Sequence, residues 1–138
     1  MDKIPTDLQI LKAIYKQYVQ TFREREFVEP PRVTKIYVPI DVRLIAKHLG
    51  TDPDELFGRL YYHLDHVYSY KQENGAKVHL FAFAVGEDRH CINFPYLAAV
   101  LAERQSQHKR ELVAIAIAVF SLVISIGSLV AQALSSGA

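Results

Sequence analysis

The longest hydrophobic pattern in the chain is an uninterrupted apolar run at residues 112–134, which contains no charged side chain. At about 1.5 Å of rise per residue, this run forms a helix of roughly 35 Å. A helix of that length crosses a hydrocarbon core of about 30 Å, whereas the apolar core helices of soluble proteins are shorter. The pattern therefore predicts one transmembrane helix, because only helices and closed barrels satisfy their backbone polar groups in lipid.

Earlier in the chain, the hydrophobic pattern changes period twice. Apolar residues recur every three or four positions at residues 7–26, which predicts an amphipathic helix. Residues 35–40 are rich in β-branched and aromatic side chains, which predicts a short strand. Pro39 favours an edge position for this strand, because proline cannot donate a hydrogen bond to a neighbour.

Two short helices joined by one tight turn are predicted next. Asp41 is suited to cap the first, Gly50 to end it, and Asp52 followed by Pro53 to begin the second. The second helix carries leucines at a spacing of four, and these are expected to pack on apolar residues of the first. The two sets are Leu56, Leu60 and Leu64 against Leu44, Ile45 and Leu49, with Ala46 as the small residue that allows close approach.

The remaining pattern predicts a hairpin and a last helix. Residues 78–85 and 90–94 have the composition of strands, and residues 86–89 are suited to a turn between them. Pro95 suits the first position of a helix, and neither Gly nor Pro interrupts the chain from there to Gly127. A nearly continuous helix from Pro95 through the apolar run is therefore expected.

The helix pair at residues 44–64 resembles a helix-turn-helix unit, with Gly50 in the turn. The order helix, short strand, helix, helix, strand, turn, strand is similar to that of winged-helix domains. The resemblance implies an α+β fold, a winged-helix-like small domain followed by a single C-terminal transmembrane helix; an unrelated small α+β domain is the alternative. The expected parts are the domain, a connecting helix, the span and a short non-cytoplasmic tail, at residues 1–94, 95–111, 112–134 and 135–138.

Charge is confined to the part of the chain before the apolar run, which holds all of the 16 Lys and Arg and all of the 15 Asp and Glu. Arg104, Lys109 and Arg110 precede the span, whereas the tail has no charged side chain. The positive-inside bias places the N-terminal domain in the cytoplasm, so we expect a single-pass protein of the inner (cytoplasmic) membrane. The lone Cys91 excludes an internal disulfide, which agrees with a reducing compartment.

The sequence lacks the motifs of common enzymes and metal sites. It contains no GxSxG elbow, no phosphate-binding glycine loop and neither CxxC nor HExxH spacing. His63 and His66 lie one turn apart, and His79 and His90 lie near Cys91, but this spacing does not predict four converging zinc ligands. We therefore expect no enzymatic activity, no cofactor and no bound metal.

The winged-helix resemblance implies DNA binding, but the charges of the second helix in the pair disfavour it. The N-terminal end of that helix would meet the DNA, and there Asp54 and Glu55 repel phosphate. The candidate nucleic-acid contacts that could offset these acids are Arg43, Lys47, Arg59 and Arg89. DNA therefore remains a disfavoured partner, and contact with a protein fits this surface better.

Inside the apolar run, small and polar residues recur at intervals of three and four, which is the period of a left-handed coiled coil. A facing helix gains close packing and hydrogen bonds from such a face, whereas lipid does not, so we expect self-association. The alternative is that the serines bond only to carbonyls of their own helix. This polar stripe comprises Ala114, Ala118, Ser121, Ser125, Ser128 and Gln132.

Together, these patterns predict a membrane protein whose cytoplasmic domain is a protein-interaction or scaffold module and which oligomerises through the polar stripe. Its expected partners are the lipid bilayer, further copies of itself and a cytoplasmic protein. Two alternatives are a membrane-tethered DNA-binding transcriptional regulator and a small pore-forming membrane effector. The polar stripe lacks the charged rings of a selective channel, which favours the first interpretation over the pore.

Overall fold

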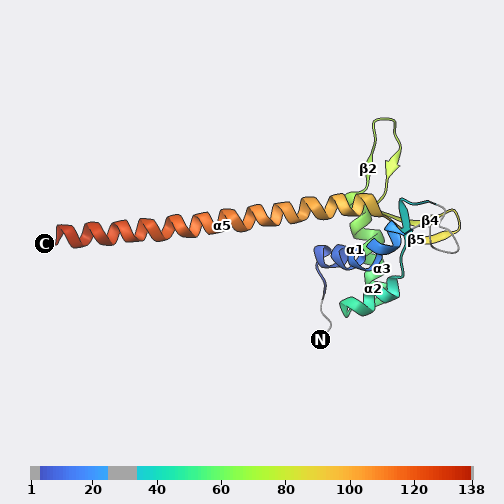
Figure 1. The fold of residues 1–138 in the computed structure, drawn as a ribbon, viewed down its shortest axis with the longest axis horizontal. Coiled ribbons are helices and arrows are strands. Elements are labelled where there is room, and N and C mark those ends of the chain that lie inside the picture. Colours follow the sequence, from blue (N-terminus) through green and yellow to red (C-terminus); the bar gives the residue numbers. More distant parts are fainter. Residues whose placement is uncertain (1–3, 25–33, 138) are drawn as a thin grey trace. The chain divides into compact units, whose positions relative to one another are not determined.

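The structure, a computed structural model, describes residues 4–24 and 34–137, and the chain divides into two units at residues 1–101 and 102–138. The first unit is a mixed α+β fold, and the second is formed by one long helix (Figure 1). The predicted α+β region followed by a long apolar helix is therefore confirmed. The elements in order are α1 (Asp7–Arg23), β1 (Tyr37–Pro39), α2 (Val42–Leu49), α3 (Pro53–Gly58), the π-helix η2 (Arg59–Leu64), α4 (Asp65–Tyr68), β2 (Tyr70–Lys71), β3 (Lys77–Val78), β4 (Phe81–Val85), β5 (Asp88–Asn93) and α5 (Phe94–Ser136).

Helix α1 begins with a reciprocal capping box. The amide of Gln9 donates to the hydroxyl of Thr6 at 3.2 Å, and the amide of Thr6 donates to the side-chain carbonyl of Gln9 at 2.9 Å. These two bonds satisfy backbone donors that the first turn leaves without helical partners. The amphipathic helix predicted here is confirmed as far as Arg23, and its predicted end at residue 26 lies outside the described residues.

The predicted helix pair is confirmed, with its predicted caps. Asp41 caps α2 and Asp52 caps α3, and each carboxylate accepts hydrogen bonds from two backbone amides of the first turn. Gly50 ends α2 in the left-handed conformation, with φ of +67°, which glycine adopts without a steric penalty. Ile45 and Ala46 of α2 are fully buried.

Helix α3 continues directly into the π-helical turn η2, which keeps side chains spaced by four on one face. Four-residue steps in an α-helix drift by about 40° each. Hydrogen bonds of a π-helix reach from residue i to i+5, so one turn holds more residues and this drift becomes smaller. Leu56, Leu60 and Leu64 consequently share one buried face, and none of them is more than 1% exposed.

Strands β1, β5 and β4 form an antiparallel sheet in that order. β1 lies at one edge, as Pro39 predicts. The β4–β5 turn differs from the prediction, because it contains only Gly86 and Glu87, and the next two residues already belong to β5. A two-residue loop requires positive φ in its centre, and Gly86 supplies it with φ of +60°.

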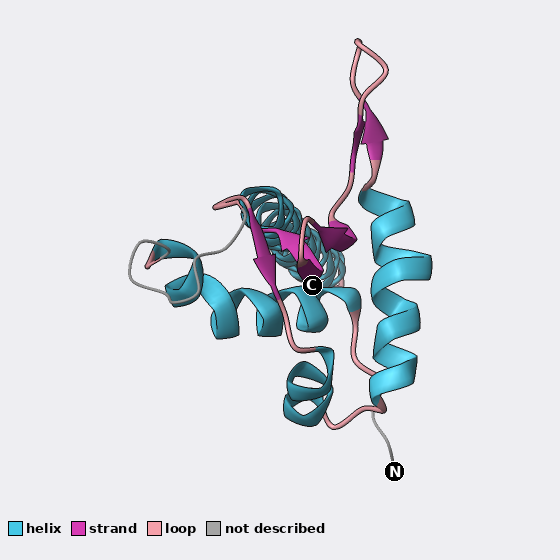
Figure 2. Ribbon diagram, turned by 90° about the vertical axis from the view of Figure 1, so that its right-hand side faces the viewer, coloured by secondary structure: helices cyan, strands magenta, loops and turns pink. Residues whose placement is uncertain are grey.

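The strand predicted at residues 78–85 is split in two. Its start belongs to a separate hairpin, β2–β3, which stands away from the three-stranded sheet (Figure 2). Asp65 fixes the break, because its Oδ1 accepts hydrogen bonds from the amides of Leu80 and Phe81, both at 3.0 Å. These two amides are bonded to a side chain rather than to a neighbouring strand, so the strand restarts only at β4.

The core of the first unit is built from α1, α2, α3–η2, the sheet and the first two turns of α5. From α5 it includes Phe94, Leu97, Val100 and Leu101. Phe94 stacks with the rings of Tyr15 and Phe22 of α1, at centroid separations of 5.3 and 4.7 Å. The packed unit therefore extends through Leu101, where α5 leaves the core.

Helix α5 is a single helix of 43 residues, which confirms the continuous helix predicted from Pro95 through the apolar run. Asn93 supports its start, because the side-chain carbonyl of Asn93 accepts a hydrogen bond from the amide of Tyr96 at 3.3 Å. By length and composition, α5 can cross a membrane, and none of its most apolar window is buried. A helix with this composition and exposure indicates association with a membrane.

Replacing Asp65 with alanine is expected to destabilise the first unit by about 2–4 kcal/mol, because the buried amides of Leu80 and Phe81 lose their shared acceptor. Asp65→Asn retains an acceptor oxygen and is expected to cost less than half as much. Urea unfolding of the full chain in detergent measures the difference. The eight tyrosines all lie in the first unit, so the tyrosine band of the near-ultraviolet circular dichroism spectrum follows that unit alone.

The matched control is Glu73→Ala, which removes an exposed carboxylate from the loop of the β2–β3 hairpin. Its free energy of unfolding is expected to stay within about 0.5 kcal/mol of the wild-type value. An Asp65→Ala protein as stable as this control would show that the split between β3 and β4 does not depend on the Asp65 carboxylate.

Candidate functional site

A cleft of about 610 Å³ opens where the N-terminal ends of α2 and α3 approach the β4–β5 hairpin. We call it the aromatic cleft. Its apolar lining comes from Ile40, Val42, Pro53, Phe57, Phe83 and His90, and its charged lining from Asp41, Arg43 and Asp54. The volume lies within the range of pockets that hold small ligands.

Four rings are packed together at the cleft, namely those of Phe57, Tyr61, Phe83 and His90. The centroid separations are 4.7 Å between Phe57 and Tyr61, 6.0 Å between Tyr61 and Phe83, and 5.1 Å between Phe83 and His90. These separations are in the range in which aromatic pairs attract each other. Phe83 nevertheless remains 57% exposed, so its ring presents apolar surface at the mouth of the cavity.

His90 is held in a strained backbone conformation. Its φ is +52°. Among residues 4–24 and 34–137, His90 is the only residue other than glycine with a positive φ. This region costs a residue with a Cβ about 1–3 kcal/mol, so surrounding contacts must fix it. The His90 carbonyl accepts a hydrogen bond from the amide of Ile40 at 2.9 Å, and its Nδ1 lies 3.0 Å from the Tyr61 hydroxyl. These contacts fix the imidazole in the wall of the cleft.

The two weakly acidic groups behind the cleft keep their protons. Burial, with smaller contributions from Cys91 and Asp65, raises the pKa of Tyr61 to about 12. Burial, with a smaller contribution from Asp88, raises the pKa of the Cys91 thiol to about 11. A buried thiol with a raised pKa is a poor nucleophile.

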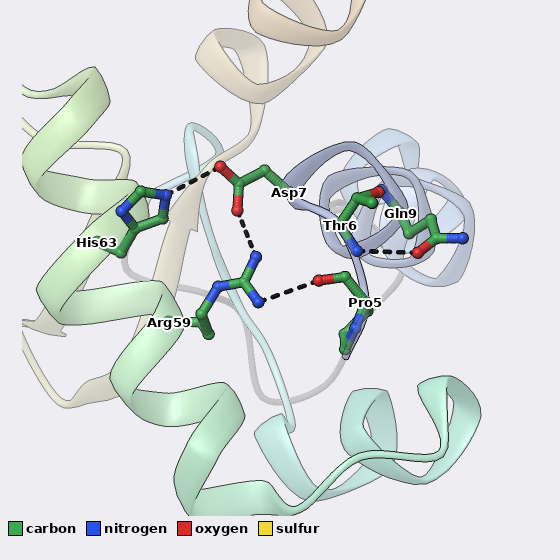
Figure 3. A network of polar contacts seen from close by, with 6 residues as sticks. All are labelled: Pro5, Thr6, Asp7, Gln9, Arg59 and His63. Carbon is green, nitrogen blue, oxygen red and sulfur yellow. Dashed lines mark hydrogen bonds and ion pairs between the residues drawn. The ribbon is translucent and has the colours of Figure 1, made fainter. Parts of the chain in front are cut away.

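Arg59, a candidate nucleic-acid contact, lies away from the aromatic cleft and is engaged by Asp7 (Figure 3). Its guanidinium lies 2.5 Å from Asp7 Oδ1 and donates to the carbonyl of Pro5 at 3.0 Å. His63 Nε2 lies 2.9 Å from the other oxygen of Asp7. Arg59 and His63 thus tie η2 to the start of α1.

The other candidate nucleic-acid contacts, Arg43, Lys47 and Arg89, are exposed, and only Arg43 lines the aromatic cleft. Within the described part of the chain, no three His, Cys, Asp or Glu side chains lie together as metal ligands do. His79 instead contacts Asp65, with Nδ1 at 3.0 Å from Oδ2. The structure therefore distributes the histidines over separate contacts.

All residues of the polar stripe lie on the exposed surface of α5, as do Arg104, Lys109 and Arg110. In the single chain, the Ser125 hydroxyl donates to the carbonyl of Ser121 at 2.9 Å. Ser135, just beyond the stripe, donates to the carbonyl of Gln132 at 3.1 Å. These hydrogen bonds are local to the helix, and serines that make them can still pack closely against a second helix.

The aromatic cleft is the feature that the sequence analysis misses. Its rings come from α3, η2, β4 and β5, and the only local signal is the spacing of four between Phe57 and Tyr61. That spacing on a helix is equally typical of a buried core face. No protein family, no curated protein and no solved structure matches the chain.

The Asp7 network makes stability depend on pH. Burial raises the pKa of Asp7, but hydrogen bonds from Arg59 and His63 outweigh burial and hold the pKa below its ordinary value of 3.8. Since the folded pKa is the lower one, the stabilisation is present above the unfolded pKa and is lost as pH falls through the folded pKa.

We therefore expect Asp7→Asn to be less stable than the wild type at pH 7 by about 1 kcal/mol. The difference should shrink as the pH falls below the ordinary pKa of Asp7 and vanish below the lowered pKa of the folded protein. Urea unfolding at a series of pH values measures it, with Glu73→Gln as the control for loss of one exposed carboxylate. A constant difference at all pH values would mean that Asp7 stabilises the fold without using its charge.

Proposed function

We propose that this protein is a single-pass membrane protein, anchored by α5, whose N-terminal domain is a winged-helix-like protein-interaction module facing the cytoplasm. The aromatic cleft is the observation that supports the protein-binding role. An exposed ring such as Phe83 beside a concave, largely apolar surface is typical of binding sites, and aromatic residues are enriched at protein interfaces. The apolar part of α5 supports the anchor.

The order of elements supports the winged-helix part of the proposal. α1, β1, α2, α3, β4 and β5 follow one another as helix, strand, helix, helix, strand and strand, the order that the resemblance implies. Two segments are additional to that order, the helical extension formed by the π-helical turn η2 with α4, and the β2–β3 hairpin. Both lie between α3 and β4, and neither interrupts the pairing of β1, β5 and β4.

The distribution of charge favours a protein over DNA as the partner. The first turn of α3 carries Asp54 and Glu55, which repel phosphate. Arg59 is the cation of that helical segment closest to these acids, and it is paired with Asp7. A phosphate backbone would therefore meet carboxylates at the N-terminal end of α3, whereas a protein surface can supply complementary positive charge.

We further propose that α5 serves as an oligomerisation element. Self-association through the polar stripe would bring several domains to one place on the membrane, as expected of a scaffold. The stripe puts small residues on one face of the part of α5 that is exposed on all sides, residues 102–137. Close approach of helices in lipid requires such residues. Arg104, Lys109 and Arg110 before the apolar part support the cytoplasmic placement of the domain.

Site-specific crosslinking tests the interaction assignment. A photoreactive phenylalanine analogue at position 83 of the full chain, expressed in its native cells, is expected to form an adduct that protease removes and nuclease does not. The same analogue at Glu73, on the exposed hairpin, is the control and should give no such adduct. A nuclease-sensitive adduct would replace the protein interpretation with the DNA-binding one.

A second experiment tests the polar stripe. The double variant Ser125→Leu, Gln132→Leu is expected to weaken self-association in lipid bilayers at least about threefold, because each interhelical hydrogen bond contributes about 0.6–2 kcal/mol. Energy transfer between labelled chains, measured as a function of the lipid-to-protein ratio, gives the association constant. Ile115→Leu, Ile126→Leu alters residues outside the stripe and is the matched control. Equal association of both variants would contradict the proposed interface.

A further inference from the structure

Carboxylates dominate the charge around the aromatic cleft. Asp41 and Asp54 line it, and Asp52 lies at the adjoining N-terminus of α3. Asp41 and Asp52 offset the partial positive charge of the helices that they cap, whereas Asp54, one position into α3, is exposed and adds a further negative charge. Arg43 is the cation in the lining, so the cleft carries an excess of negative charge.

The rings that line the cleft pack edge to face against one another and leave the ring of Phe83 exposed. The plane of His90 is nearly perpendicular to that of Phe57, at 81°, and lies at 71° to that of Phe83. The exposed ring of Phe83 can lie under a guanidinium or ammonium group. Such a contact contributes about 0.5–1 kcal/mol at an exposed site, and more where water is excluded.

We propose that the aromatic cleft binds a basic segment of a partner protein, in which an arginine or lysine flanks an apolar side chain. The apolar side chain fills the cavity lined by Ile40, Phe57 and His90. The cation lies between the Asp54 carboxylate and the ring of Phe83. This inference rests on the proposed function of the cleft as a protein-binding site, and it assigns the chemical class of the partner.

Charge complementarity selects this occupant. An acidic segment or a phosphate would meet Asp41 and Asp54 at the cleft. A purely apolar segment would leave the exposed carboxylate of Asp54 next to uncharged surface, which costs desolvation without compensation. A basic and apolar segment matches the carboxylates and the rings at the same time. Its binding should weaken with salt, because Asp54 is exposed to solvent.

The experiment uses the full chain in nanodiscs of zwitterionic phosphatidylcholine, which avoids attraction of basic peptides to anionic lipid. Three fluorescent twelve-residue peptides of glycine and serine carry Arg-Leu-Arg, Ser-Leu-Ser or Glu-Leu-Glu at the centre. Fluorescence anisotropy gives the dissociation constants. The basic peptide is expected to bind at least about tenfold more tightly than the neutral one at low salt, and this advantage should shrink at high salt.

Variants locate the effect in the cleft. Asp54→Asn should weaken binding of the basic peptide at least about threefold and leave the neutral peptide unchanged. Phe83→Ala should weaken binding of both peptides, because both place leucine in the cavity. The controls, which remove a carboxylate and a ring from the β2–β3 hairpin, are Glu73→Gln and Tyr70→Ala, and neither should alter binding.

Equal binding of the neutral and basic peptides, or tighter binding of the acidic one, would overturn the assignment of a basic partner and leave the cleft as a protein-binding site. Failure of all three peptides to bind would also overturn it. Crosslinking from position 83 then decides the proposed function independently, because it captures a protein partner of any charge.

Discussion

The Asp65 carboxylate is the interaction on which the domain's architecture depends most. It lies at the start of α4, and one of its oxygens accepts hydrogen bonds from the amides of Leu80 and Phe81. A single side chain thus ends one stretch of extended backbone and sets the start of β4. Since residues two apart in a strand share one face, this start also places Phe81 and Phe83 on the same face of β4, where both rings lie beside that of Tyr61.

The π-helical turn η2 is the second feature on which the arrangement of the domain depends. Because it keeps residues spaced by four in line, it lets one short helical segment serve three surfaces. Leu60 and Leu64 are buried in the core, and Arg59 and His63 both reach Asp7. Phe57, just before the turn, lies against the ring of Tyr61 and extends the aromatic wall toward the end of α3. The hydrophobic core, the contacts of Asp7 with Arg59 and His63, and the aromatic cleft therefore all depend on the helical segment α3–η2.

Those parts of the fold that depend on neighbouring residues could be predicted from the sequence. Thr6, Asp41 and Asp52 cap helices through amides two or three positions away, and Gly50 ends α2 through its own backbone freedom. The split of the strand expected at residues 78–85 could not be predicted, because its cause, Asp65, lies in a different element. A strand and a strand interrupted by a distant carboxylate have the same local composition.

The same distinction applies to function. A helix that is able to cross a membrane is a property of length and composition alone, and the apolar run of α5 has both. The cleft arises only when the ends of α2 and α3 meet the hairpin, and the individual signals of its residues favour other roles. Phe57 has the spacing of a core residue. Asp41 has the sequence context of a helix cap, and in the structure it both caps α2 and lines the cleft.

At His90, the conformation that the backbone prefers and the side chain that lines the cleft conflict. Glycine would occupy a backbone with φ of +52° without steric cost, whereas histidine keeps an imidazole in the cleft at the expense of strain. Selection for stability alone would favour a smaller residue there, and selection for a shaped binding surface would favour the ring. Under the proposed function of the cleft, stability and binding therefore favour different residues at position 90.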